Sequence, residues 1–227
     1  MLFFLTKLLL SSIFVHFIFL KSLLANDENN KDLAIHHFMQ GEFLLNQGNY
    51  ALAVLEFQDA LDIDPNAPTI HTSIADGYRR LGRSKHAENH LEIAIALDSN
   101  DIAAREMLGQ LYLLNRKYKL AENQFLALSK IDSNNDNYLS ILGDLSKLQK
   151  SWDKSIDFYL KAYQINPQNF KVLENAMQVC LSVELFKKAE EICKILVSYN
   201  PNNSNYWLTY KQITAYNKNY LNTLNAI

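Results

Sequence analysis

The stretch GEFLLNQGNYALAVLEFQDALDIDP, residues 41–65, decides the fold of this chain, because it contains two short helical patterns separated by a turn. Its second half carries an apolar stripe at steps of three and four residues: Tyr50, Ala53, Phe57 and Ala60. Gly48 lies between the two halves and favours a turn, and Pro65 cannot continue the second helix. The stretch therefore predicts helix, tight turn, helix and short loop.

The same unit returns every 34 residues, which is typical of a repeat architecture. One series contains only small residues, which allow helices to approach closely: Ala53, Ala87, Ala121, Ser155, Ala189 and Thr223. A second is mostly aromatic: Tyr50, Ser84, Tyr118, Trp152, Phe186 and Tyr220. A third contains residues that break or cap helices: Pro65, Ser99, Ser133, Pro167 and Pro201. Several series that agree at one spacing predict stacked helix pairs.

These positions resemble those of the tetratricopeptide repeat family, whose aromatic position in the first helix of a unit is taken by Tyr78 and Tyr112. The resemblance covers about 85 per cent of the chain. It implies an all-α fold, a right-handed α-solenoid of antiparallel helix pairs. By the family's register, five units cover residues 34–67, 68–101, 102–135, 136–169 and 170–203.

Some positions depart from the family's pattern. His37 and His71 stand where a large apolar residue is usual, and Met177 and Cys180 weaken the fifth unit. A partial sixth unit or cap is expected over residues 204–227, with Trp207 at the family's tryptophan position. The second helix of this unit, Asn217 to Ile227, would be truncated. Its apolar stripe would consist of Leu221, Leu224 and Ile227.

Residues 1–25 differ from the rest of the chain, because Leu8–Leu20 has no charged residue and a lysine flanks it on each side. As a helix these 13 residues would extend about 20 Å, less than the roughly 30 Å hydrocarbon layer of a membrane. They predict a signal peptide cleaved after Ala25, and hence a periplasmic or secreted protein. The alternative is an uncleaved inner-membrane anchor over residues 2–24. A polar linker is expected at 26–33.

Composition restricts the class of partner. The chain is 48% hydrophobic and 20% charged, which is typical of a globular protein. It has 22 basic and 24 acidic residues, so there is no electrostatic footprint for nucleic acid. The sequence contains no nucleophile elbow, glycine-rich phosphate loop or metal-spaced cysteine set. We therefore expect neither an enzyme nor a bound cofactor.

The resemblance also implies a partner groove, since the first helix of each unit lines the concave face in this family. Ile35 and Thr69 share that face, and the residues that we expect to contact a partner come from all five units. In the first two units they are Phe38, Glu42, Leu45, Asp76, Arg79 and Arg80. In the next three they are Gln110, Leu113, Leu114, Asn137, Lys147 and Lys171. Such a groove would suit an extended or helical peptide without strong charge. The alternative is an unused, solvated face.

Two charge patterns refine this expectation. The lysine and asparagine clamp with which chaperone-tail receptors of the family hold a terminal carboxylate is absent, because Phe38 and Glu42 occupy those positions. Arg79, Arg80 and Arg83 form the densest basic cluster. They could clasp an acidic motif or a phosphate, but the favoured interpretation is a solvated helix end, where cations suit the helix dipole.

Two further pairs have chemical potential. His86 and His90 are four residues apart on a helix and could share a metal ion, but the sequence offers no evident third ligand, so we expect no metal site. Cys180 and Cys193 are expected on the two helices of the fifth unit, about a turn out of alignment. Buried free thiols are therefore favoured over a disulfide.

Together these features predict a protein–protein interaction scaffold exported to a bacterial envelope, which binds a partner peptide or helix in its groove. The alternative is a membrane-anchored or self-associating assembly protein that uses residues 204–227. The sequence does not identify the partner.

Overall fold

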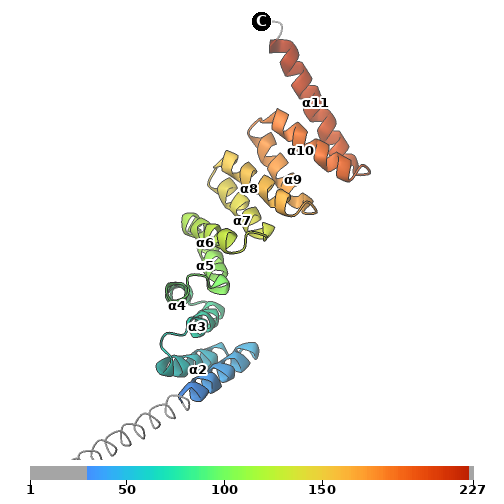
Figure 1. Cartoon of the computed structure of the whole chain (residues 1–227). Coiled ribbons are helices and arrows are strands. Elements are labelled where there is room, and N and C mark those ends of the chain that lie inside the picture. The colour runs from blue at the N-terminus through green and yellow to red at the C-terminus, as the bar shows by residue number, and fades with distance from the viewer. Residues whose placement is uncertain (1–29, 225–227) are drawn as a thin grey trace, which may run out of the picture. The chain divides into compact units, whose positions relative to one another are not determined.

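The computed structural model describes residues 30–224, with side chains up to residue 218, and contains there only helices, turns and loops (Figure 1). The predicted all-α fold class is confirmed. The expected signal peptide or anchor over residues 1–25 lies outside the described residues, as do the side chains of the 217–227 stripe beyond Lys218. Within the described part, no helix has both the length and the hydropathy that crossing a bilayer requires.

The helices follow the 34-residue period. A helix over residues 30–46 comes first. It is followed by α2 (Tyr50–Ile63), α3 (Pro68–Arg80), α4 (Ser84–Leu97), α5 (Ile102–Leu114), α6 (Tyr118–Ile131), α7 (Asp136–Leu148), α8 (Trp152–Ile165), α9 (Phe170–Ser182), α10 (Phe186–Tyr199) and α11 (Ser204–Leu224). The even-numbered helices all begin at positions of the aromatic series, which shows that this series marks the start of the second helix of each pair.

The chain divides into two compact units, Met1–Met107 and Leu108–Ile227, with the boundary inside α5. In the first unit, α3 packs against α2 and α4. In the second, α6 to α11 pack each against the next along the chain. Because about three residues connect the two helices of a pair, these helices run antiparallel.

Each of these turns contains one residue in the left-handed backbone region. The five lie 34 residues apart: Gly48, Gly82, Arg116, Lys150 and Glu184. In the first turn, the Gly48 N–H donates to the Leu45 carbonyl and the Asn49 N–H donates to the Leu44 carbonyl. This pair of hydrogen bonds is a Schellman motif, which satisfies the last carbonyls of the helix and reverses the chain. The same pair recurs at the other four turns.

The core of each pair combines a small residue with a large one. Gly41 lies against the Phe57 ring, Gly109 against Phe125, and Gly143 against Tyr159. A Cβ atom at Gly143 would lie only 2.5 Å from the Tyr159 ring, so the two helices are in contact there without an intervening side chain. These three glycines therefore set the distance between the paired helices.

The two cysteines are free and buried on α9 and α10, which confirms the prediction of unpaired thiols. Burial raises the pKa of the Cys180 thiol to about 11 and also raises that of Cys193. Both thiols belong to a core cluster with Met177, Leu173 and Ile192. They behave as small apolar residues.

Two predicted boundaries were wrong. Residues 30–33, which were expected in the linker, are helical. The first helix thus begins before residue 34, where the first repeat was expected to start, and Ala34 is already buried. The expected break before residue 217 is also absent, since α11 continues from Ser204 to Leu224. No glycine or proline follows Pro201, so the sequence contains no residue that would end this helix early.

Candidate partner-binding surface

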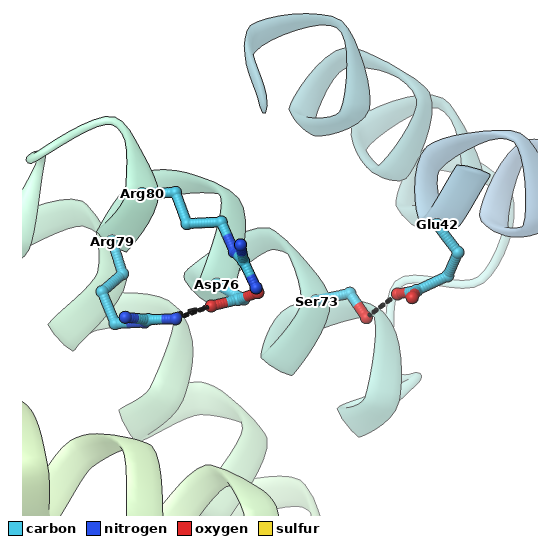
Figure 2. Close-up of polar contacts among 5 residues, drawn as sticks. All are labelled: Glu42, Ser73, Asp76, Arg79 and Arg80. Atoms are coloured by element: carbon cyan, nitrogen blue, oxygen red, sulfur yellow. Dashed lines mark hydrogen bonds and ion pairs between the residues drawn. The ribbon is translucent and has the colours of Figure 1, made fainter. Parts of the chain in front are cut away.

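The first unit contains a surface formed by the helix over residues 30–46 and by α3, which we call the N-terminal surface. It comprises Ile35, Phe38, Glu42, Thr69, Ser73, Asp76, Arg79 and Arg80. The two helices are joined by a hydrogen bond in which the Ser73 hydroxyl donates to a Glu42 carboxylate oxygen at 2.6 Å (Figure 2). Ser73 is not among the predicted residues, because nothing in the sequence marks which groove positions pair with each other.

An apolar pocket lies at one end of the N-terminal surface. Its volume is about 600 Å³, which lies within the range of about 300 to 1,000 Å³ that is usual for ligand pockets. It is lined by Asn30, Lys31, Ala34, Ile35, Phe38, Ile63, Asp64, Thr69 and Ile70. Phe38 is half-buried and packs on Phe57, with ring centroids 5.8 Å apart. The pocket can therefore accept an apolar side chain and has polar groups at its edge.

A charged cluster lies further along α3. Asp76 accepts hydrogen bonds from both neighbouring guanidinium groups, including one of 2.8 Å from Arg80 Nε (Figure 2). The Arg80 guanidinium also lies over the Tyr50 ring, 5.5 Å from its centroid. Two arginines and one aspartate leave a net positive charge, and each arginine side chain remains about 40% exposed, with 40% and 42%. The cluster is neither a bare basic patch nor a free helix end, since Asp76 fixes both arginines.

Leu45 was predicted to line the groove, and this prediction was wrong. It is only 8% exposed, and its Cδ1 atom lies 3.9 Å from the place where a side chain on Gly77 would begin. Because Gly77 lacks a side chain, α3 comes close to the end of the first helix and covers Leu45. This residue contributes to the core rather than to a contact with a partner.

The remaining predicted residues lie in the second unit. Leu114 on α5 is 77% exposed, Gln110 is exposed and Leu113 is half-buried. Asn137 on α7 is exposed, whereas Lys147 on the same helix forms an ion pair with Asp144 at 3.4 Å. Lys171 on α9 pairs with Glu174 at 3.2 Å. Two of the predicted cations are therefore already paired within their own helices.

The histidines are arranged differently from the predicted pair. His90 is directed at His71 on α3, with their Nδ1 atoms 3.0 Å apart, and His71 is only 5% exposed. Both His86 and His90 lie against the Tyr78 ring, with centroids 5.0 and 5.7 Å away. The predicted spacing of four residues thus places the two imidazoles on one tyrosine, and the partner of His90 comes from the neighbouring helix.

A second histidine position lies on the first helix. His37 Nδ1 is 2.8 Å from a Glu56 carboxylate oxygen on α2. His37 and Glu56 precede His71 and His90 by 34 residues, so the two pairs occupy equivalent places in successive repeats. Asp59, one turn after Glu56, offers a third ligand atom, and all three atoms lie within 4.8 Å of one another. This cluster was missed because its members come from separate helices.

Comparison with known proteins supports the helix-pair architecture. The family model described as the tetratricopeptide repeat matches residues 20–68 and 72–137. A crystal structure of MamA superposes with a TM-score of 0.66 at 17% identity, covering 77% of this chain and 96% of that one. YrrB, described as a protein of this family with an unusual peptide-binding site, gives a TM-score of 0.63 at 18% identity, covering 83% and 97%.

Two further similarities are weaker, one in its TM-score and the other in the length that it covers. PilF of Pseudomonas aeruginosa gives a TM-score of 0.57 at 17% identity, over 84% of this chain and 86% of that one. At such identities these structures show the fold alone. A protein O-mannosyl-transferase of Caenorhabditis elegans is 31% identical over 75 residues, which span 33% of this chain and 11% of that protein.

Proposed function

Because this chain belongs to the tetratricopeptide repeat family, we propose that it is a protein-interaction scaffold that binds a peptide segment of a partner on the N-terminal surface. The observation that carries the proposal is an apolar pocket that shares α3 with a fixed, partly exposed arginine pair. An apolar anchor in a pocket beside charged groups that set orientation is a common arrangement for peptide recognition.

The spacing of these features defines the peptide. Ile70 lines the pocket and Arg80 lies ten residues later on the same helix, which corresponds to about 15 Å along its axis. An extended peptide covers that distance with about four or five residues. The net positive charge around Asp76 favours a carboxylate at the far end. We therefore propose a peptide with an apolar side chain and an acidic residue about four or five positions apart.

Selection from a random peptide display library on the purified protein tests this proposal. We expect enrichment of peptides with that apolar and acidic spacing. Ile35→Asp and Arg79→Glu should each weaken the selected peptide at least about tenfold, because each removes one of the two anchors. Asn89→Asp is the matched control, because Asn89 is an exposed residue of α4 that does not belong to the N-terminal surface. Equal binding by wild type and both variants, with unchanged helix content, would contradict the proposal.

A second candidate function is self-association through α11. Trp207, Leu208 and Tyr216 are 48%, 58% and 48% exposed on this helix, which favours contact with a second copy. Light scattering over a range of concentrations would then show a mass above that of one chain, and Leu208→Asp would restore the monomer. The mass of one chain at all concentrations would exclude this function.

Export to a bacterial envelope is proposed from residues 1–25 alone, as is the alternative of an inner-membrane anchor over residues 2–24. The intact mass of the protein in the soluble envelope and membrane fractions distinguishes them. The similarity to the mannosyl-transferase covers too little of that protein to transfer its activity, and the proposed scaffold requires no cofactor.

A further inference from the structure

The cluster of His37, Glu56 and Asp59 combines one imidazole nitrogen and two carboxylates on neighbouring helices. Glu56 and Asp59 are one turn apart on α2, so their side chains lie on the same side of that helix. His37 reaches them from the helix over residues 30–46, and its Nδ1 atom lies 2.8 Å from Glu56 Oε2. The side chains of His37 and Glu56 are 25% and 30% exposed. The cluster is therefore accessible and brings three ligand atoms together without a change of backbone.

We propose that this cluster binds a divalent transition-metal ion of the zinc class. Two ligand atoms of one tetrahedral Zn²⁺ ion lie about 3.3 Å apart, since each bond is about 2.0 to 2.1 Å long. The His37–Glu56 separation of 2.8 Å is that of a hydrogen bond, so the two side chains need to part by only about 0.5 Å for an ion to replace the proton between them. Asp59 is exposed, so its side chain can rotate to close the third bond. Solvent would supply the remaining ligand, as in open zinc sites with three protein ligands.

The mixed ligands determine the class of ion. Mg²⁺ and Ca²⁺ prefer oxygen ligands alone and more of them than this cluster provides. An imidazole with carboxylates suits Zn²⁺ and its neighbours in the transition series. We therefore expect selectivity for Zn²⁺ over Mg²⁺.

The equivalent residues of the second repeat show why the metal site is proposed in the first repeat. There His71 and His90 also bring two nitrogens together, 3.0 Å apart, but His71 is buried. The position equivalent to Asp59 is Ile93, which has no ligand atom. The second pair thus lacks both the third ligand and the exposure that the first pair has.

Metal binding would connect the first helix to α2. His37 adjoins Phe38, which lines the pocket of the N-terminal surface. An ion held by both helices would restrain the helix that supplies this pocket wall, and it would stabilise the folded chain, because the unfolded chain does not bring the three ligands together. This inference does not depend on the peptide proposal, since metal binding is measured without a peptide.

Isothermal titration of the purified, untagged full chain with Zn²⁺, and separately with Mg²⁺, tests the site. We expect one Zn²⁺ per chain, saturation below about 0.1 mM, and no binding of Mg²⁺ in that range. His37→Ala and Asp59→Asn should each weaken Zn²⁺ binding by at least about tenfold, because even second-shell losses reach that size. His36→Ala, which removes an exposed neighbouring imidazole, should leave the affinity unchanged.

Two results would overturn the proposal. One is the absence of Zn²⁺ binding at about 0.1 mM. The other is unchanged affinity in both His37→Ala and Asp59→Asn, which would assign any bound zinc to other residues. If His37→Ala loses helix content, the exposed Asp59→Asn variant alone decides. Thermal unfolding gives a second readout, since Zn²⁺ should raise the melting temperature of wild type and of His36→Ala but not of Asp59→Asn.

Discussion

At the scale of single residues, the packing of each helix pair rests on a small residue opposite a large one. Gly143 and Tyr159 illustrate this, because the ring occupies the space where a Cβ would stand. In the fifth repeat the sizes are reversed, since Met177 and Cys193 take the equivalent positions and both are buried in one cluster. The departure at Met177 is thus accompanied by a smaller residue on the opposite helix.

We predict that Gly143→Ala lowers the free energy of unfolding by about 1–3 kcal/mol, because the added methyl group must displace the buried Tyr159 ring. Tyr159 cannot move freely, since its hydroxyl donates to Asp144 at 2.6 Å. Urea unfolding measures the change. Asn137→Ala, at an exposed position on the same helix, should change stability much less. Equal stability of the two variants would show that the helices can separate at little cost.

The pair of the buried His71 and the half-buried His90 predicts a dependence of stability on pH. Burial, together with the charges of His71 and His86, lowers the pKa of His90 to about 4. Burial also lowers the pKa of His71, against the opposing effect of the hydrogen bond that its imidazole donates to the Pro65 backbone carbonyl. In the unfolded chain both groups return to ordinary values of about 6.5. Between these values the unfolded chain binds protons that the folded chain does not, so stability should decrease as pH falls from about 6.5 towards 4.

Urea unfolding at several pH values checks this effect. His90→Gln removes one titrating group and keeps a hydrogen-bonding side chain beside His71, so the decrease should be smaller in this variant. His36→Gln, at an exposed site, should follow wild type. A slope that is identical in His90→Gln and wild type would assign the pH dependence to other residues.

At the scale of elements, the turn inside each helix pair keeps one backbone geometry, but the residue at its left-handed position differs from turn to turn. Gly48 and Gly82 adopt positive φ without strain, whereas Arg116, Lys150 and Glu184 adopt φ of 57°, 57° and 60°. A side chain in this region costs about 1–2 kcal/mol. The Schellman hydrogen bonds and the packing of the two helices hold these residues there.

We therefore predict opposite effects of two substitutions at equivalent turn positions. Lys150→Gly should raise the free energy of unfolding by about 1 kcal/mol, since it relieves the left-handed strain. Gly82→Ala should lower it by a similar amount, although no atom lies within 4 Å of the new methyl group. Thermal or urea unfolding gives both values. Changes of the same sign would mean that backbone conformation is not the dominant factor.

At the scale of the whole molecule, the sequence predicted the helices better than the surface. The 34-residue period placed the starts of the even-numbered helices because turns and small residues act locally. It did not reveal that Leu45 is covered or that Ser73 holds Glu42, because both depend on how one repeat packs on the next. It also missed the His37, Glu56 and Asp59 cluster, which joins residues far apart in the sequence. Side-chain pairing between helices, within a repeat and between repeats, is thus what periodicity leaves open.

The most direct test of the central claim is site-specific photo-cross-linking. An apolar benzophenone amino acid is placed at Ile35, which lines the pocket, or at Asn89 on α4, and each protein is irradiated with the selected peptide. Binding on the N-terminal surface predicts a cross-linked adduct from Ile35 that is lost with Arg79→Glu and is absent from Asn89. Equal adducts from both positions, or an adduct from Asn89 alone, would contradict binding on the N-terminal surface.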